Sequence, residues 1–270
     1  MRTKFHRLAP FAGILLCAGL TVACNKLKAR DQLNKGVMAF RSAHFPEAVN
    51  HFQEAVSLDP TLLNAKLFLA TAYSQQYAPG GASPENLKMG DLAISSYEEV
   101  LKADPNNKAA LGNIGQIYYE MQKFDKAKEY QERLLKIDPN NPETYYWIGV
   151  LDYIPCNVNW TGMRRDLNLL TPKDPKHPGV LPPLPEKARK ELAEKNATLV
   201  DEGMQMLQKA LQLKPNYLEA MAYLNLMYRQ KADLETDNSA READLKEADQ
   251  WVDKYLDLRK RASQTQKSGA

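Results

Sequence analysis

The side chains that most often carry enzyme chemistry are sparse and widely spaced in this sequence of 270 residues. It contains no H-E-x-x-H, C-x-x-C or G-x-S-x-G motif, and Gly80-Gly81 lacks the Lys-Ser/Thr tail of a phosphate-binding loop. Carboxylates are numerous but stand beside lysines, as at Lys246-Glu247, which is typical of a solvated helix face. We therefore predict a protein that is not an enzyme and that has no metal site and no cofactor.

One short stretch has residue types suited to binding. Trp160-Thr161-Gly162-Met163-Arg164-Arg165 places an aromatic ring near two guanidinium groups. Trp160, Arg164 and Arg165 could together hold an anionic or aromatic partner. The alternative is that Trp160 anchors its segment on the rest of the fold while the arginines pair with acids such as Asp166.

The N-terminus has the pattern of an export signal. Residues 1–7 are short and basic, and residues 8–23 are apolar, contain Pro10 and end in small residues. Such a segment is short for a bilayer span and is typical of a cleaved secretory signal. We therefore predict a signal peptide at residues 1–23.

The end of this segment, Leu20-Thr21-Val22-Ala23-Cys24, resembles the lipobox of bacterial lipoproteins. That resemblance implies cleavage before Cys24 and lipidation of its thiol, with residues 24–28 as a short tether. Thr21 departs from the family, which prefers Leu at that position, so ordinary signal cleavage with an incidental Cys24 thiol remains the alternative. An anchored protein would face the periplasm, and Asn25 is compatible with sorting to the outer membrane.

The charge balance argues against nucleic acid as a partner. The net charge is +3, and removal of Arg2, Lys4 and Arg7 with the signal leaves Lys and Arg equal in number to the 33 Asp and Glu. Cys17 would leave with the signal and Cys24 would be lipidated, so Cys156 would be the one free thiol. We then expect no internal disulfide, and stability must come from packing.

The strongest pattern is a repeat. Four segments end alike, with an apolar pair five and four residues before Pro60, Pro105, Pro139 or Pro215 and an apolar residue two before it. The interval from Pro105 to Pro139 is 34 residues. Alignment on these prolines brings small residues into one register. The small positions are Gly36, Ala70, Gly115 and Gly149 in the first helix of each pair and Ala48, Ala93, Ala127 and Ala248 in the second, where Phe52, Tyr97 and Leu207 follow as large residues.

Over about residues 29–258 the chain resembles the tetratricopeptide-repeat (TPR) family. Two helices approach closely only where one side chain is very small, and a proline ends each pair. The resemblance implies an all-α solenoid of about five helix pairs whose stacked neighbours share a core.

The fourth repeat departs from the period. We predict an insertion at about residues 153–192 that is a proline-braced loop, followed by a long helix from Glu186. Its prolines are Pro155, Pro172, Pro175, Pro178, Pro182, Pro183 and Pro185. Residues 259–270 are basic, small and polar, and we predict a disordered tail.

The TPR resemblance also implies a function. Such arrays bind extended peptides or helices on a concave face lined by the first helix of each pair, so we expect protein or peptide partners in the cell envelope and a membrane contact through the lipid. By register, the concave face would present Phe40, Asn64, Thr71, Gln75, Gln116, Tyr119, Tyr146, Tyr153 and Arg229. The Lys and Asn with which one subgroup clamps a terminal carboxylate are replaced here by Leu33 and Val37.

Two functional hypotheses follow. The first is a lipid-anchored periplasmic scaffold that mediates protein–protein interactions. The alternative is a module that captures a small molecule or glycan in a pocket between the insertion and the concave face, near Tyr146, Tyr153 and Trp160.

Overall fold

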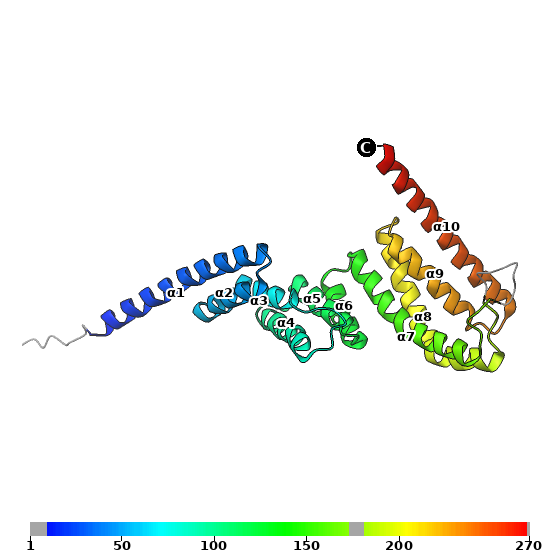
Figure 1. Ribbon diagram of the computed structural model, residues 1–270, viewed down its shortest axis with the longest axis horizontal. Helices are drawn as coiled ribbons and strands as arrows, with labels where there is room; N and C mark the ends of the chain where they lie inside the picture. The colour runs from blue at the N-terminus through cyan, green and yellow to red at the C-terminus, as the bar shows by residue number, and fades with distance from the viewer. Residues whose placement is uncertain (1–9, 173–180, 269–270) are drawn as a thin grey trace, which may run out of the picture. The chain divides into compact units, whose positions relative to one another are not determined.

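The computed structural model describes residues 10–172 and 181–268. Within these ranges the chain forms ten α-helices and no strand, which confirms the predicted all-α array of about five helix pairs (Figure 1). The helices divide into two compact units, residues 1–123 and 124–270. Each unit is described by itself.

The first unit contains five helices in sequence, each packed on its neighbour in the chain. They are α1 (Pro10–Arg41), α2 (Phe45–Leu58), α3 (Leu63–Ser74), α4 (Pro84–Ala103) and α5 (Lys108–Glu120). The predicted pairing of small and large residues explains the close approach of α1 and α2. A Cβ on Gly36 would lie 2.5 Å from the ring of Phe52, which is fully buried and stacks on Phe68 at 5.6 Å.

The long connection from α3 to α4 is held by one side chain. Gly80 has a φ of +76°, a conformation that glycine adopts without strain. The Asn86 amide accepts a hydrogen bond from the Ala78 N–H and donates to the carbonyls of Ala78 and Gly81. The Ser83 hydroxyl accepts from the Asn86 N–H and caps α4, which begins at Pro84. These contacts fix the point at which the next helix starts.

The second unit also contains five helices. They are α6 (Phe124–Ile137), α7 (Pro142–Asp166), α8 (Glu186–Leu213), α9 (Leu218–Ala232) and α10 (Asn238–Ser268). Neighbours in the chain pack on one another, and α7 also contacts α9. A Cβ on Gly149 of α7 would lie 2.6 Å from Leu207 Cγ of α8, so the predicted small–large contact is present here too. Gly203 of α8 gives similar room to Met227 of α9.

Two sequence predictions differ from the structure. The irregular segment does not begin at Tyr153, because α7 continues through Pro155 to Asp166. A single proline removes one backbone hydrogen bond, and the burial of Leu151 and Cys156 on either side favours keeping the helix. The described irregular residues are 167–172 and 181–185, and Pro175 and Pro178 lie outside the described range. The predicted disordered tail is helical as far as Ser268, since α10 continues through it.

The predicted signal peptide and tether coincide with the start of α1. Residues 1–9 lie outside the described range, and α1 passes through residues 24–28 without a break, so the tether is helical. The Cys24 thiol is free and exposed. Within the described part of the chain, no helix combines the length and the apolar character that crossing a bilayer requires.

Candidate functional site

The predicted binding residues of the first unit lie on α1, α3 and α5, the first helix of each pair. Phe40 is half-buried and its ring meets Phe45 edge-on at 5.3 Å, whereas Asn64 and Gln75 are exposed. Thr71 is engaged within the fold: its hydroxyl donates to the Leu67 carbonyl and lies 3.0 Å from the Tyr97 hydroxyl.

Two further predicted residues of this unit lie on α5. The Gln116 amide donates to the Glu120 carboxylate at 2.8 Å on the same helix, and Tyr119 is half-buried. Amide and phenol groups at this level of exposure can bond the backbone of a peptide.

In the second unit, the structure brings the predicted tyrosines into an aromatic cluster on α7 and α9. The cluster consists of Tyr146, Trp147, Tyr153, Tyr217 and Tyr223. The Tyr146 ring lies 5.0 Å from Tyr217 and 5.8 Å from Tyr223, and the Tyr153 ring lies 5.3 Å from Tyr223. Such edge-on and tilted pairs give a rigid surface of large contact area.

Two phenols of this cluster, those of Tyr217 and Tyr153, remain protonated near neutral pH. Burial raises the pKa of Tyr217 to about 12, and the charges of Glu143 and Glu219 act in the same direction. Burial also raises the pKa of Tyr153, whose hydroxyl donates to Asn157 Oδ1 at 3.0 Å. The cluster therefore offers hydrogen-bonding hydroxyls and no negative charge.

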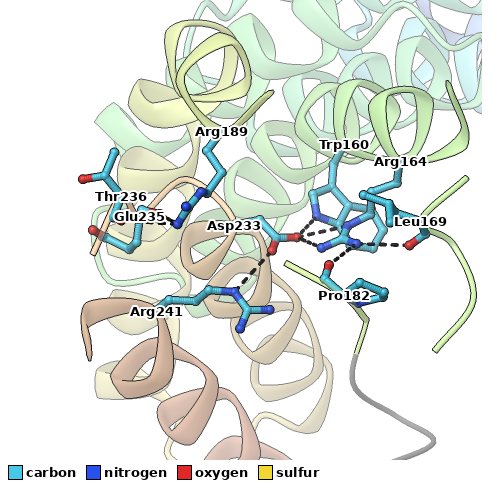
Figure 2. Close-up of polar contacts among 9 residues, drawn as sticks. All are labelled: Trp160, Arg164, Leu169, Pro182, Arg189, Asp233, Glu235, Thr236 and Arg241. Carbon is cyan, nitrogen blue, oxygen red and sulfur yellow. Dashed lines mark hydrogen bonds and ion pairs between the residues drawn. The ribbon is translucent and has the colours of Figure 1, made fainter. Parts of the chain in front are cut away.

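The predicted pair Trp160 and Arg164 belongs to a buried polar centre that also includes Asp233 and Arg241 (Figure 2). Asp233 Oδ2 accepts hydrogen bonds from Trp160 Nε1 at 2.6 Å and from Arg164 Nε at 3.1 Å, and it pairs with Arg164 Nη2. The Arg164 guanidinium also lies 4.8 Å from the centre of the Trp160 ring. Arg164 is 1% exposed, so it is a structural group and cannot hold a partner at the surface.

The anchoring interpretation of this stretch therefore fits the structure, with one correction. The partner of Arg164 is Asp233, not Asp166, because α7 packs against α9 and turns Arg164 inward. Arg164 Nη1 donates to the carbonyls of Leu169 and Pro182 and so ties the segment after α7 to the helices. Arg165, in contrast, is exposed.

A cavity of about 110 Å³ lies beside the polar centre. Four predicted residues line it, namely Tyr153, Trp160, Arg164 and Arg229, together with Leu181 and residues of α9 and α10. The predicted pocket near Tyr153 and Trp160 is therefore present, whereas Tyr146 lies in the aromatic cluster and does not line it. Sequence reasoning missed Gln230, Asp233 and Arg241, because no motif or spacing in the sequence marks them.

A second buried charge lies where α6 meets α7. Asp152 is 1% exposed and accepts a hydrogen bond from Lys128 Nζ at 2.6 Å, and Lys128 also reaches Glu202 at 3.2 Å. Burial raises the pKa of Asp152 from its usual 3.8 to about 6, although Lys128 opposes this shift. Burial likewise raises the pKa of the Cys156 thiol to about 12, so the thiol is protonated and unreactive at neutral pH. Across residues 10–172 and 181–268, no cluster of three or more His, Cys, Asp and Glu could hold a metal ion.

The fold and these surfaces define an array of antiparallel helix pairs that presents side chains for binding. Residues 88–147 match the tetratricopeptide repeat family. These residues therefore carry a tetratricopeptide repeat, the type of repeat that the register of small residues predicts.

Curated relatives match over part of the chain. It is 32% identical over 105 residues to Hsp70-Hsp90 organizing protein 3 of Arabidopsis thaliana and 31% identical over 101 residues to Hsp70-Hsp90 organizing protein 1 of Glycine max. These matches cover 38% and 37% of this chain, which spans only 17% and 16% of the length of those relatives.

Solved structures match over most of the chain at low identity. A MamA crystal structure gives a TM-score of 0.57 at 13% identity, covering 88% of this chain and 94% of that one. MamA from Desulfovibrio magneticus RS-1 gives 0.55 at 17% identity, with coverages of 86% and 96%. YrrB, a TPR protein with an unusual peptide-binding site, gives 0.54 at 14% identity, with coverages of 89% and 91%. At this identity the likeness concerns the fold.

Proposed function

We propose that this chain is a non-catalytic scaffold that binds peptides or proteins through the first helix of each pair. The observation that carries this proposal is the aromatic cluster, in which Tyr146, Tyr153 and Tyr223 remain half-buried on α7 and α9. Tyrosines in this state give contact area at little cost in side-chain entropy and keep a hydroxyl for a peptide backbone. The family supports the same use, since YrrB is described as having a peptide-binding site.

A crosslinking experiment in intact cells tests the scaffold proposal. A photoreactive amino acid is placed at Tyr146, Asn64 or Gln75, and a matched control is placed at Lys190, an exposed residue of α8. We expect one discrete protein adduct shared by the first three positions and missing from the control. Equal labelling at all positions would show non-specific proximity and would contradict the proposal.

We further propose that the chain is exported and held on the outer membrane, facing the periplasm, by a lipid on Cys24. The lipobox-like sequence supports this proposal, as do the exposed Lys26, Leu27 and Lys28 that follow Cys24 on α1. Lysines beside a lipid anchor favour anionic headgroups. Labelling with radioactive palmitate should mark the wild type and leave Cys24→Ala unmarked, and membrane fractionation then gives the compartment. Equal labelling of the two would exclude this anchor.

A second candidate function is the capture of a small molecule or glycan in the cavity beside the polar centre. The specific observation in its favour is that Gln230, 3% exposed, lines this cavity while its side-chain oxygen accepts no hydrogen bond within the described residues. A panel of metabolites screened by thermal shift tests this function. Stabilisation that is lost in Leu226→Phe, which narrows the cavity, supports it, and a panel without such a compound argues against it.

A further inference from the structure

The cavity beside the polar centre has an excess of positive charge. Its charged lining consists of three guanidinium groups and one carboxylate. Asp233 is already committed to Arg164, while Arg229 pairs outside the cavity with Asp249 at 2.7 Å. Arg241 remains, and the second oxygen of the same Asp233 lies 3.8 Å from Arg241 Nε (Figure 2). One carboxylate thus faces two guanidinium groups, that of the buried Arg164 and that of the half-buried Arg241.

Two polar atoms in this lining have no hydrogen-bond partner within the described residues. One is Arg241 Nε, a donor on a side chain that is 13% exposed, and the other is Gln230 Oε1, an acceptor. A buried polar atom without a partner costs about 1–3 kcal/mol, so native structures leave few such atoms unpaired. The pair calls for a ligand that brings an acceptor to Arg241 and a donor to Gln230.

The rest of the lining is apolar and limits the size of this ligand. The cavity is also lined by three leucines and two aromatic rings, namely Leu181, Leu226, Leu245, Tyr153 and Trp160. Benzene has six non-hydrogen atoms and fits an apolar cavity of about 150 Å³, so the space of about 110 Å³ holds about four or five such atoms, and the open side of the cavity leaves room for a few more. The ligand is therefore a small aliphatic molecule with an anionic group.

The donor on this ligand is better supplied by a hydroxyl than by an ammonium group. A hydroxyl has one proton to donate, which matches the single unpaired acceptor Gln230 Oε1. An ammonium group would bring three donors and a further positive charge next to Arg164 and Arg241.

We propose that this cavity binds a small aliphatic 2-hydroxycarboxylate. Its carboxylate pairs with Arg241, its hydroxyl donates to Gln230 Oε1, and its alkyl groups lie against Leu226 and Leu245. This inference rests on the second candidate function and names the class of molecule that is captured.

Isothermal titration with four compounds of nearly equal shape tests the proposal. The probe is 2-hydroxyisobutyrate. Isobutyrate lacks the hydroxyl, 2-hydroxyisobutyramide lacks the charge, and 2-aminoisobutyrate replaces the hydroxyl with an ammonium group. We expect the probe to bind with a dissociation constant below about 1 mM, and each of the other three to bind at least about tenfold more weakly.

Three variants locate the binding and one serves as a control. Arg241→Gln and Gln230→Leu should each weaken the probe by about tenfold or more. Leu226→Phe narrows the cavity without changing a polar group and should weaken binding by about tenfold or more. Arg259→Gln, a change at an exposed position of the same helix α10, should bind like the wild type. Far-UV circular dichroism at the titration temperature checks that every variant is folded.

The possible failures are distinct. No binding of 2-hydroxyisobutyrate at 10-fold the expected constant, about 10 mM, would overturn the proposal, as would equal binding of isobutyrate or an unchanged affinity in a folded Arg241→Gln. If the metabolite panel then finds another compound whose stabilisation is lost in Leu226→Phe, the ligand class is wrong and the capture function stands. If nothing in the panel depends on Leu226, both are wrong.

Discussion

Removal of the Asp233 carboxylate should be one of the most damaging single changes in the second unit. Asp233→Ala leaves the Arg164 guanidinium, 1% exposed, without its counter-charge and leaves Trp160 Nε1 without its acceptor. Breaking a buried ion pair on one side costs about 3–5 kcal/mol. The loss is compounded here because Arg241 then faces Arg164 with no carboxylate between them.

The reverse change should cost less. Arg164→Met removes the close partner of Asp233, but Trp160 Nε1 still donates to the carboxylate and Arg241 Nε lies 3.8 Å away, near enough to approach. We expect Arg164→Met to be less destabilising than Asp233→Ala by about 1–2 kcal/mol. Asp249→Ala is the matched control, since that carboxylate is 68% exposed and its pair with Arg229 should contribute about 0–1 kcal/mol.

Urea unfolding measures these differences. The three tryptophans, Trp147, Trp160 and Trp251, all lie in the second unit, so their fluorescence reports the unfolding of that unit, and circular dichroism follows the whole chain. A loss below about 1 kcal/mol in Asp233→Ala, or a larger loss in Arg164→Met than in Asp233→Ala, would refute the reasoning.

Three further predictions concern the same unit. In Gly149→Ala the new Cβ would lie 2.6 Å from a leucine atom of α8, so urea unfolding should show that the free energy of unfolding falls by about 1–3 kcal/mol. Gly162 on the same helix has open space around it, so Gly162→Ala should raise the free energy of unfolding by up to about 1 kcal/mol. The pKa of Asp152 is about 6 in the folded state and 3.8 ordinarily, so the folded state keeps a proton that the unfolded chain releases. The free energy of unfolding should therefore fall by roughly 3 kcal/mol as the pH rises from 3.8 to 6. Asp152→Asn should remove this slope from a pH series of urea titrations, and an unchanged slope would assign it to another group. In a background of Cys17→Ser and Cys24→Ser, the fully buried Cys156 should react with a thiol reagent only on unfolding. Rapid labelling of the folded protein at pH 8 would contradict its raised pKa.

The spacing of small residues predicted the contacts between paired helices well. Gly36 against Phe52 and Gly149 against Leu207 were both identified by register, because a repeat places the same contact at the same position in every helix pair. The course of the chain around Pro155 was predicted wrongly. A composition rich in proline indicates irregular structure, yet the structure keeps the helix where apolar neighbours are buried, as Leu151 and Cys156 are.

The polar centre was only half visible in the sequence. Trp160 and Arg164 stood out by type, but Asp233 follows them by 73 and 69 residues and looked like any other acid on a charged helix. The unpaired atoms of Gln230 and Arg241 had no sequence signal at all, since the lack of a partner depends on everything that surrounds the atom.

The sequence by itself determined the helical repeat, the positions at which helices touch and the ends of α2, α4, α6 and α8, which each lie two residues before a repeat proline. These features depend on side-chain size and backbone freedom over a few residues and recur with a fixed period. The tertiary structure alone decided which charges meet, which cavity forms beside them and how far the pKa of Asp152 moves. These properties arise because α7 packs against α6, α8 and α9 and water is excluded where they meet. Electrostatic energies depend on distance and burial, which no local sequence pattern encodes.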